Sequence, residues 1–267
     1  KLTSGEDAGA GGIVKQLVGL IRQQIDELRK KGDKEKLQKA IDGFTAILND
    51  EIAQTKLSPE FILYLSLCYD SMGKHAKAAG ELAKVPEPRP AAGQKEVQLY
   101  HDVQLLLMRE LRLSKEEVNE KDYEANLDKA MTVLDEVMGA RAKPGWGARN
   151  IGALKEQAYL LAAKKQYAEA ARKANALVKQ LLPKATDNTI REHYLECYYI
   201  QVYAYLKHSQ GLSNEARKEK GIKEAARQVV QLESKWKDFG TDASKKRFLD
   251  LLDKESDLKA EYEKQKK

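Results

Sequence analysis

Hydrophobic side chains recur every three or four residues along most of this chain, with polar side chains between them. That spacing places the hydrophobic side chains on one face of a helix. All six prolines fall where the pattern is interrupted, and proline is tolerated in the first turn of a helix but not in its interior. The pattern predicts about eleven helices, over residues 13–31, 34–53, 59–72, 75–85, 92–112, 115–139, 148–164, 167–182, 187–209, 214–237 and 242–264.

Two short motifs mark where helices should begin. Ser58 precedes Pro59, so the serine is expected to cap the helix that starts at the proline. Ser114 is followed three residues later by Glu117, the spacing of a capping box, which predicts a second helix start. Residues 1–12 contain several glycines and no hydrophobic period, so they are predicted to form a flexible N-terminal segment.

The composition favours helices over strands. Alanine and leucine account for 65 of the 267 residues, whereas valine, isoleucine and threonine, which favour strands, number only 30. The mean hydropathy is −0.63, and no hydrophobic run is long enough to cross a bilayer, so we expect no membrane insertion. We therefore predict a soluble, all-α protein.

Positive and negative charges are interleaved along the chain, as in the Lys-Glu-Lys run at 34–36. Lys and Arg total 47 and Asp and Glu total 41, so the formal net charge is +6. Because no basic block stands out, a mixed, solvated surface is favoured over a nucleic-acid-binding stripe. Cys68 and Cys197 both lie in hydrophobic helical patterns and predict no disulfide framework. A start at Lys1 fits a processed chain or a fragment, so the compartment stays open between cytoplasm and, after loss of a signal, export.

One pattern recurs five times, each time in the second helix of a predicted pair. A large hydrophobic or aromatic residue is followed by alanine three positions on, and by hydrophobic residues seven and ten positions on. These spacings put four side chains on one helix face, where the alanine allows a second helix to approach closely. The five instances are Leu37/Ala40/Phe44/Ile47, His75/Ala78/Leu82/Val85, Leu127/Ala130/Leu134/Val137, Tyr167/Ala170/Ala174/Leu177 and Ile222/Ala225/Val229/Leu232.

Two of these units match over their whole length, at a separation of 92 residues. The large-small-large first helix, the turn glycine Gly73 and the second-helix Ala78 resemble the tetratricopeptide repeat (TPR) family, and Tyr167 takes the aromatic place in the later unit. The matched positions are Ile62, Ser66, Tyr69, Gly73, His75, Ala78, Leu82 and Val85 with Leu154, Ala158, Leu161, Lys165, Tyr167, Ala170, Ala174 and Leu177.

The resemblance covers residues 13–238 and is strongest in 59–90 and 150–183. The repeat alanines lie 38, 52, 40 and 55 residues apart, which is longer than the family period of about 34. The remaining units are therefore expected to carry longer helices or inserted loops, such as 113–121 and 208–221.

The resemblance implies a right-handed alpha-alpha superhelix, a TPR-like solenoid of about five helical hairpins whose first helices line a concave face. It implies a repeat domain over 13–238, followed by a C-terminal capping helix and tail over 239–267. A helix at 242–264 suits a cap because one of its sides is hydrophobic and the other is charged. The hydrophobic stripe is Phe248, Leu251, Leu252, Leu258 and Tyr262.

The sequence contains no recognisable catalytic or cofactor-binding motif, such as GxxxxGK[ST], GxGxxG or GxSxG. No carboxylate stands in a hydrophobic run that would raise its pKa. His193 and Cys197 form an i, i+4 pair, for which packing is favoured over a catalytic dyad or a metal site. We predict no enzyme activity, no cofactor and no metal site, since ligand spacing is absent among the histidines, His75, His101, His193 and His208.

The helix predicted at 187–209 is rich in tyrosine and carries two stripes. The first stripe should face the hairpin partner, and the second is interpreted either as further packing or as a binding platform, because tyrosine offers large contact area at low entropy cost. Lys155 and Tyr159, from the preceding hairpin, are expected to lie beside the second stripe. The first stripe is Leu195, Tyr199, Val202 and Leu206, and the second is Tyr194, Tyr198, Gln201 and Tyr205.

These features favour a non-catalytic scaffold that binds another protein or a peptide segment on its concave face. The alternative is a helical-repeat RNA-binding protein, which would need near-constant repeats, so nucleic acid is the less favoured partner. The candidate partner-binding residues are Lys155, Tyr159, Tyr194, Tyr198, Gln201 and Tyr205.

Overall fold

The computed structural model describes residues 19–21, 23–54, 58–89, 91–138 and 150–267. Within these ranges the chain forms helices and no strand, which confirms the all-α prediction. The predicted flexible segment at the N-terminus lies outside the described residues. None of the described helices is both long and hydrophobic enough to span a bilayer.

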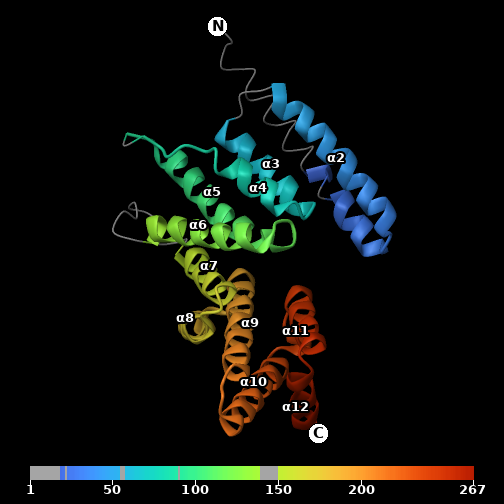
Figure 1. Ribbon diagram of the computed structural model, residues 1–267, viewed down its shortest axis with the longest axis vertical. Coiled ribbons are helices and arrows are strands. Elements are labelled where there is room, and N and C mark those ends of the chain that lie inside the picture. The colour runs from blue at the N-terminus through green and yellow to red at the C-terminus, as the bar shows by residue number, and fades with distance from the viewer. Residues whose placement is uncertain (1–18, 22, 55–57, 90, 139–149) are drawn as a thin grey trace. The chain divides into compact units, whose positions relative to one another are not determined.

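The chain divides into two compact units, residues 1–139 (unit 1) and residues 140–267 (unit 2). In unit 1 each of α3, α4 and α5 packs against the next helix along the chain (Figure 1). A hydrophobic cluster that includes Leu65, Cys68 and Tyr69 of α3 forms its core. The helices of unit 1 are residues 19–21 and 23–31, then α2 (Lys34–Gln54), α3 (Pro59–Ser71), α4 (His75–Leu82), α5 (Gln94–Leu113) and α6 (Glu120–Met138).

In unit 2 the long helix α9 is the centre of the packing, with α7, α8, α10 and α11 all against it, and α12 packs on α10 (Figure 1). Its core holds fully buried side chains from α9, α10 and α11, among them Leu195, Val229 and Phe248. The helices are α7 (Asn150–Ala163), α8 (Tyr167–Leu181), α9 (Asn188–Gln210), α10 (Glu215–Lys235), α11 (Asp242–Lys254) and α12 (Ser256–Lys266).

The prediction of one capping helix over 242–264 is wrong. The chain bends at Glu255, and the segment forms two helices, α11 and α12. The Glu255 carboxylate accepts a hydrogen bond from Gln210 Nε2 at 3.0 Å and pairs with Lys207 Nζ at 2.6 Å, which ties the bend to α9. The bend lets α11 pack on α9 while α12 packs on α10. The hydrophobic stripe predicted along this segment is buried, so the pattern located the buried face but not the break.

The helix predicted from residue 115 begins later than expected. Asn119 is the residue that caps α6, since its Oδ1 accepts a hydrogen bond from the backbone N–H of Asp122 at 3.0 Å. Ser114 is buried instead and closes α5, where its hydroxyl donates to the Leu111 carbonyl. The expected cap at Ser58 is confirmed, because Ser58 Oγ accepts from Phe61 N–H at 3.3 Å.

The turn between α3 and α4 has the same geometry as the turn between α7 and α8, 92 residues later. Gly73 and Lys165 both lie in the left-handed region, with φ of 72° and 61°. Each turn closes with two backbone hydrogen bonds, from Gly73 to Asp70 and Lys74 to Tyr69 in one and from Lys165 to Ala162 and Gln166 to Leu161 in the other. This hydrogen-bond pattern is the Schellman motif, so the two hairpins contain turns of the same type.

Replacing Lys165 with glycine is expected to stabilise unit 2 by about 0.5–1 kcal/mol. A non-glycine residue in the left-handed region costs about 1–2 kcal/mol, and glycine removes this cost. Part of the resulting gain in stability is offset by the greater freedom of glycine in the unfolded chain. Urea unfolding monitored by tryptophan fluorescence reports on unit 2, because both tryptophans of the chain, 146 and 236, have positions within it. Lys164→Gly is the matched control. It should destabilise unit 2, because Lys164 directly follows α7 and its backbone N–H still donates to the Leu160 carbonyl in the helical pattern.

The repeated alanines lie where helices meet. Ala78, Ala130, Ala170 and Ala225 have no exposed surface. Ala40 is partly buried against the core of unit 1. Burial at these positions agrees with the expectation of a close helix approach at each alanine.

Candidate functional site

Helix α9 is held in place from its first turn. Asp187 caps it by accepting a hydrogen bond from Ile190 N–H at 3.0 Å. One of its faces is fully buried through Leu195, Val202 and Leu206, as the first predicted stripe requires. Tyr199 extends that face and meets the ring of Phe248 on α11 edge to face, with 5.5 Å between ring centroids.

Two tyrosines of the second stripe are packing residues. Tyr194 is 3% exposed and lies between the rings of Tyr198 and Trp236, at centroid distances of 5.9 and 6.4 Å. Tyr198 donates its hydroxyl hydrogen to the backbone carbonyl of Gln228 on α10, at 2.9 Å. Burial raises the pKa of Tyr198 well above its ordinary value of 10, so the phenol stays protonated and keeps this bond.

The other two members of the second stripe reach a groove. Gln201 donates to the side chain of Gln228 at 3.2 Å, and Tyr205 is half-buried one turn further along. Both side chains line hollows between α8, α9 and α10. The structure therefore divides the predicted tyrosine stripe into a packed half and an accessible half.

The structure separates Lys155 from the tyrosine stripe. Lys155 on α7 pairs with Glu196 on α9, and Arg247 on α11 pairs with the same carboxylate at 2.7 Å. Glu196 and Tyr198 are two residues apart in a helix, so they point in nearly opposite directions. The expected group of Lys155 with the tyrosines is thus not formed, and Tyr159 is half-buried against the cluster of Ala158, Ala174 and Ile200.

Glu196 is the anionic centre of this three-helix ionic cluster. Burial would raise the pKa of Glu196, but the charges of Lys155 and Arg247 outweigh it and hold the pKa below its ordinary value of 4.5. The side chains of Lys155 and Glu196 are 15% and 19% exposed, so the pair is largely shielded from solvent. We regard this cluster as a structural link between α7, α9 and α11.

The accessible groove consists of two adjoining hollows that share Tyr205, His208 and Gln228. The larger has a volume of about 910 Å³ and the smaller about 520 Å³. Together they run over α9 from α8 to α10. Besides the shared residues, the larger is lined by Ser209, Leu212, Arg217, Lys220, Gly221, Lys223, Glu224, Arg227 and Gln265, and the smaller by Ala168, Ala171, Arg172, Asn175 and Gln201.

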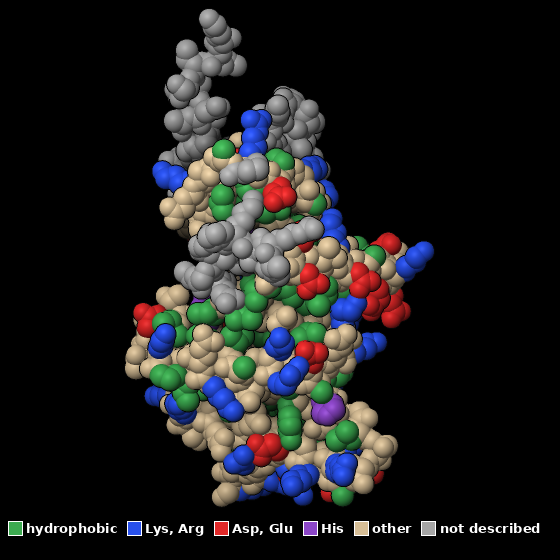
Figure 2. Space-filling view, turned by 90° about the vertical axis from the view of Figure 1, so that its left-hand side faces the viewer, with side chains coloured by type: hydrophobic (Ala, Val, Ile, Leu, Met, Phe, Trp, Pro, Cys, Tyr) green, Lys and Arg blue, Asp and Glu red, His purple; other side chains and the backbone are tan. Residues whose placement is uncertain are grey.

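The groove carries an excess of positive charge along α10. Arg217, Lys220 and Lys223 are exposed, and none of them has an ion pair with another described residue. Among the described residues that line the larger hollow, Glu224 is the one acidic residue, and Arg227 donates two hydrogen bonds of 2.7 and 2.8 Å to its carboxylate. On the face drawn in Figure 2, Lys and Arg side chains are scattered among Asp and Glu side chains.

His193 and Cys197 are packing residues rather than a reactive pair. Cys197 is fully buried, and burial raises the pKa of its thiol to about 12, which keeps it from forming a nucleophilic thiolate. Burial also lowers the pKa of His193. Neither side chain lines the groove.

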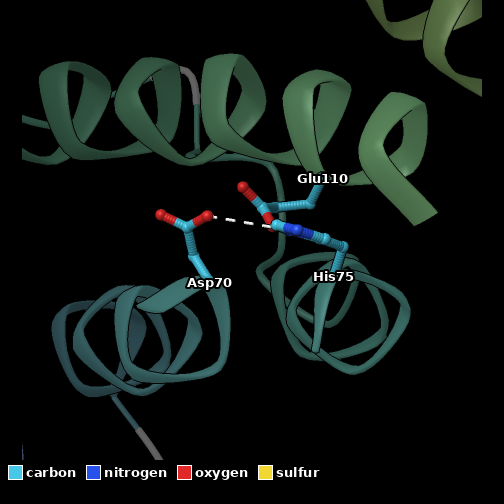
Figure 3. Close-up of side chains that lie close together, drawn as sticks. All are labelled: Asp70, His75 and Glu110. Carbon is cyan, nitrogen blue, oxygen red and sulfur yellow. Dashed lines mark hydrogen bonds and ion pairs between the residues drawn. The ribbon is translucent and has the colours of Figure 1, made fainter. Parts of the chain in front are cut away.

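Unit 1 contains a partly buried polar cluster that the sequence did not indicate (Figure 3). Asp70 lies in the last turn of α3, His75 begins α4 after the Gly73 turn, and Glu110 projects from α5. His75 Nδ1 lies 2.7 Å from Glu110 Oε2 and 3.6 Å from Asp70 Oδ1. Arg109 completes the cluster with hydrogen bonds of 3.1 and 3.2 Å to the two Asp70 oxygens.

Glu110 is the most deeply buried member of this cluster, with no exposed side-chain surface. Burial raises its pKa above the ordinary 4.5, and its hydrogen bond raises the pKa of His75 above 6.5. Glu110 Oε1 is buried and has no hydrogen-bond partner, although Arg109 Nη1 lies 3.6 Å away. Both shifts favour the protonated form of the group concerned.

Glu110 corrects the expectation that no carboxylate stands in a hydrophobic setting. Its sequence neighbours include Leu107, Met108 and Leu111, all buried, and that run was the available signal. The histidine spacings predicted no metal site, and the structure adds that His75 lies beside two carboxylates that could serve with it as ligands. The partners lie five and 35 residues away in sequence, on two other helices, so no motif spacing could reveal them.

Comparison of the chain with protein-family models, with curated proteins and with solved structures finds no match. The resemblance to the TPR family stays an expectation from the sequence.

Proposed function

We propose that this chain is a non-catalytic scaffold that binds an acidic, extended segment of another protein in the groove over α9. The observation that carries the proposal is the row of cations along α10 that form no ion pair with another described residue and line the same hollow as Tyr205 and Leu212. A cationic rim beside an aromatic and aliphatic floor complements a segment that alternates acidic with hydrophobic side chains.

We further propose that the helices are arranged as a divergent, right-handed TPR-like solenoid. Support comes from the packing of successive helices against one another within each unit, the Schellman turn common to two hairpins and the buried alanines. A solenoid suits the proposed function because neighbouring hairpins form grooves that a linear segment can follow. The groove lies between α8 and α10, the second helices of their hairpins, rather than on the first-helix face that the sequence favoured.

RNA is the competing ligand for a basic groove, and the structure gives a reason to rank it second. Single-stranded RNA is held by successive aromatic side chains that stack on its bases. In this groove Tyr205 is the one aromatic side chain besides the imidazole of His208. A peptide needs no such series, since pockets for alternate side chains and charge complementarity are enough.

The test uses the full chain and two fluorescein-labelled peptides, one alternating glutamate with leucine and phenylalanine and the other with lysine in place of glutamate. Fluorescence anisotropy should detect binding of the acidic peptide alone. Reversing two rim charges, in Lys220→Glu with Lys223→Glu, should weaken binding about tenfold at low salt, or roughly 1.4 kcal/mol.

The matched control is Lys235→Glu with Lys237→Glu, which changes the net charge equally at exposed positions outside the groove. It should bind the acidic peptide nearly as the parent chain does. The proposal fails if both double variants lose affinity equally, since attraction would then depend on overall charge. Tighter binding of a mixed-sequence RNA than of the acidic peptide would favour the RNA-binding alternative.

A further inference from the structure

A nitrogen and two carboxylate groups converge in unit 1 from three different helices (Figure 3). One donor atom from each of Asp70, His75 and Glu110 lies within 4.8 Å of the other two. We propose that these three side chains form a binding site for a zinc ion, which would link α3, α4 and α5. This site is in a different unit from the groove, so the proposal does not depend on the proposed function.

The donor set fits zinc better than magnesium or calcium. Zinc is bound by imidazole nitrogen and carboxylate oxygen, and three protein ligands leave a fourth tetrahedral position for water. Magnesium and calcium prefer oxygen ligands throughout, so the His75 nitrogen counts against them. The His75 side chain is 21% exposed, which gives solvent and the ion a route to the site.

Two of the three distances between ligand atoms can be compared with what zinc requires. Zinc lies about 2.0–2.2 Å from such ligands, which places neighbouring ligand atoms of a tetrahedron about 3.4 Å apart. The 3.6 Å between His75 Nδ1 and Asp70 Oδ1 already matches this spacing. The 2.7 Å between His75 Nδ1 and Glu110 Oε2 would have to open by about 0.7 Å, which a small side-chain rotation provides.

Glu110 supplies an independent sign of a missing partner. Its side chain is fully buried, yet Oε1 accepts no hydrogen bond. A buried carboxylate oxygen without a partner is costly, and a cation at the site would remove that cost. Figure 3 shows the Glu110 carboxylate turned toward the same space as Asp70 and His75.

Arg109 is compatible with the ion as an outer partner. It now binds both Asp70 oxygens, and it can keep Oδ2 at 3.1 Å while Oδ1 turns to the metal. Carboxylates that bind metals are commonly held by such outer hydrogen bonds. The two carboxylates and one guanidinium sum to a single negative charge, and Glu117, which accepts from Ala76 N–H nearby, adds another. A divalent ion is therefore not opposed by net positive charge.

Binding exchanges a proton for the metal ion at His75. The Nδ1 lone pair must be free to coordinate, so Nδ1–H is lost and Nε2 keeps its hydrogen. If the ring is an imidazolium, the Nδ1 proton goes to solvent, and if it is neutral with Nδ1 protonated, that proton moves to Nε2. Glu110 Oε2 loses its hydrogen-bond donor in the same step and gains the metal in its place.

The test measures zinc binding to the full chain after treatment with a chelator, by titration of zinc chloride in competition with a chromogenic chelator. The parent chain should bind one zinc ion per chain and melt at a higher temperature when zinc is present. His75→Gln should weaken zinc binding by more than about 100-fold, since even outer partners contribute 10–100-fold. Glutamine retains an N–H donor toward Glu110, which favours folding of the variant.

His208→Gln is the matched control, because it removes an exposed histidine from unit 2 and should leave the zinc ion bound. Asp70→Asn is a second variant with the same expected loss, and far-UV circular dichroism checks that both variants fold. If His75→Gln does not fold, the result for Asp70→Asn decides the question. Absence of stoichiometric zinc binding in the parent chain, or equal binding in the folded variants, would overturn the proposal, as would a preference for magnesium over zinc.

Discussion

Glu196→Gln is expected to lower the free energy of unfolding of unit 2 by about 3 kcal/mol at neutral pH, the lower end of the range for breaking a buried ion pair. The substitution keeps the shape of the side chain but removes the charge that Lys155 and Arg247 share. Lys155 is 15% exposed, so its ammonium group would remain largely shielded without a counter-ion. Urea unfolding followed by tryptophan fluorescence measures the loss.

The same substitution should change how the stability of unit 2 depends on pH. Because the folded pKa of Glu196 lies below its ordinary 4.5, its stabilising effect is fully present above pH 4.5 and is lost as the pH falls through the folded value. The difference in unfolding free energy between the parent chain and Glu196→Gln should therefore shrink on acidification below pH 4.5. Taking the difference removes the contribution of the other carboxylates, which titrate in both proteins.

Glu192→Gln provides a matched control one turn earlier on α9. Glu192 is half-buried and has no ion pair with a described residue, so its replacement should leave the unfolding free energy within about 0.5 kcal/mol of the parent value. If the two glutamine variants lose equal stability, the charge network has no special role and helix α9 is merely sensitive to substitution.

Much of the fold follows from local sequence signals. The helical period located the helices because a hydrophobic face must be buried, and Ser58 with Pro59 fixed the start of α3. The errors fall where tertiary contacts outweigh local pattern. Ser114 has the capping-box spacing but is buried at the end of α5, and the bend at Glu255 depends on Lys207 and Gln210 of another helix.

The sites were less predictable because they depend on which helices meet. The tyrosine stripe of α9 was visible as a period, but only its neighbours decide that Tyr194 is buried and Tyr205 lines a groove. Ion-pair partners are even harder to predict from sequence. Lys155 pairs with Glu196, which is 41 residues away in sequence and points away from Tyr198 on α9. Residues so distant in sequence form no local pattern, so the two ionic clusters could be identified only from the three-dimensional structure.

Gly221→Ala is expected to lower the unfolding free energy of unit 2 by about 2 kcal/mol. A Cβ atom at this buried position on α10 would overlap Oγ and Cβ of Ser209 on α9, which are too close to the backbone to move aside. We estimate a steric cost of about 3 kcal/mol, of which the better helix propensity of alanine returns about 1. The position also lines the larger hollow of the groove, so the close contact of α9 and α10 helps to set its floor.

A reciprocal change tests whether that contact is responsible. Ser209→Gly removes the side-chain atoms that the Cβ introduced by Gly221→Ala would meet, and the Ser209 hydroxyl donates only to the Tyr205 carbonyl one turn earlier in the same helix. The double variant should therefore be more stable than the sum of the two single changes predicts, by roughly 2 kcal/mol of coupling. Gly43→Ala in α2 is the control for helix propensity alone, because its Cβ would meet nothing within 4 Å. It should stabilise unit 1 by about 1 kcal/mol, and unfolding followed by far-UV circular dichroism measures both variants. If Gly221→Ala stabilises the protein as Gly43→Ala does, α9 and α10 are not in the close contact on which the groove depends.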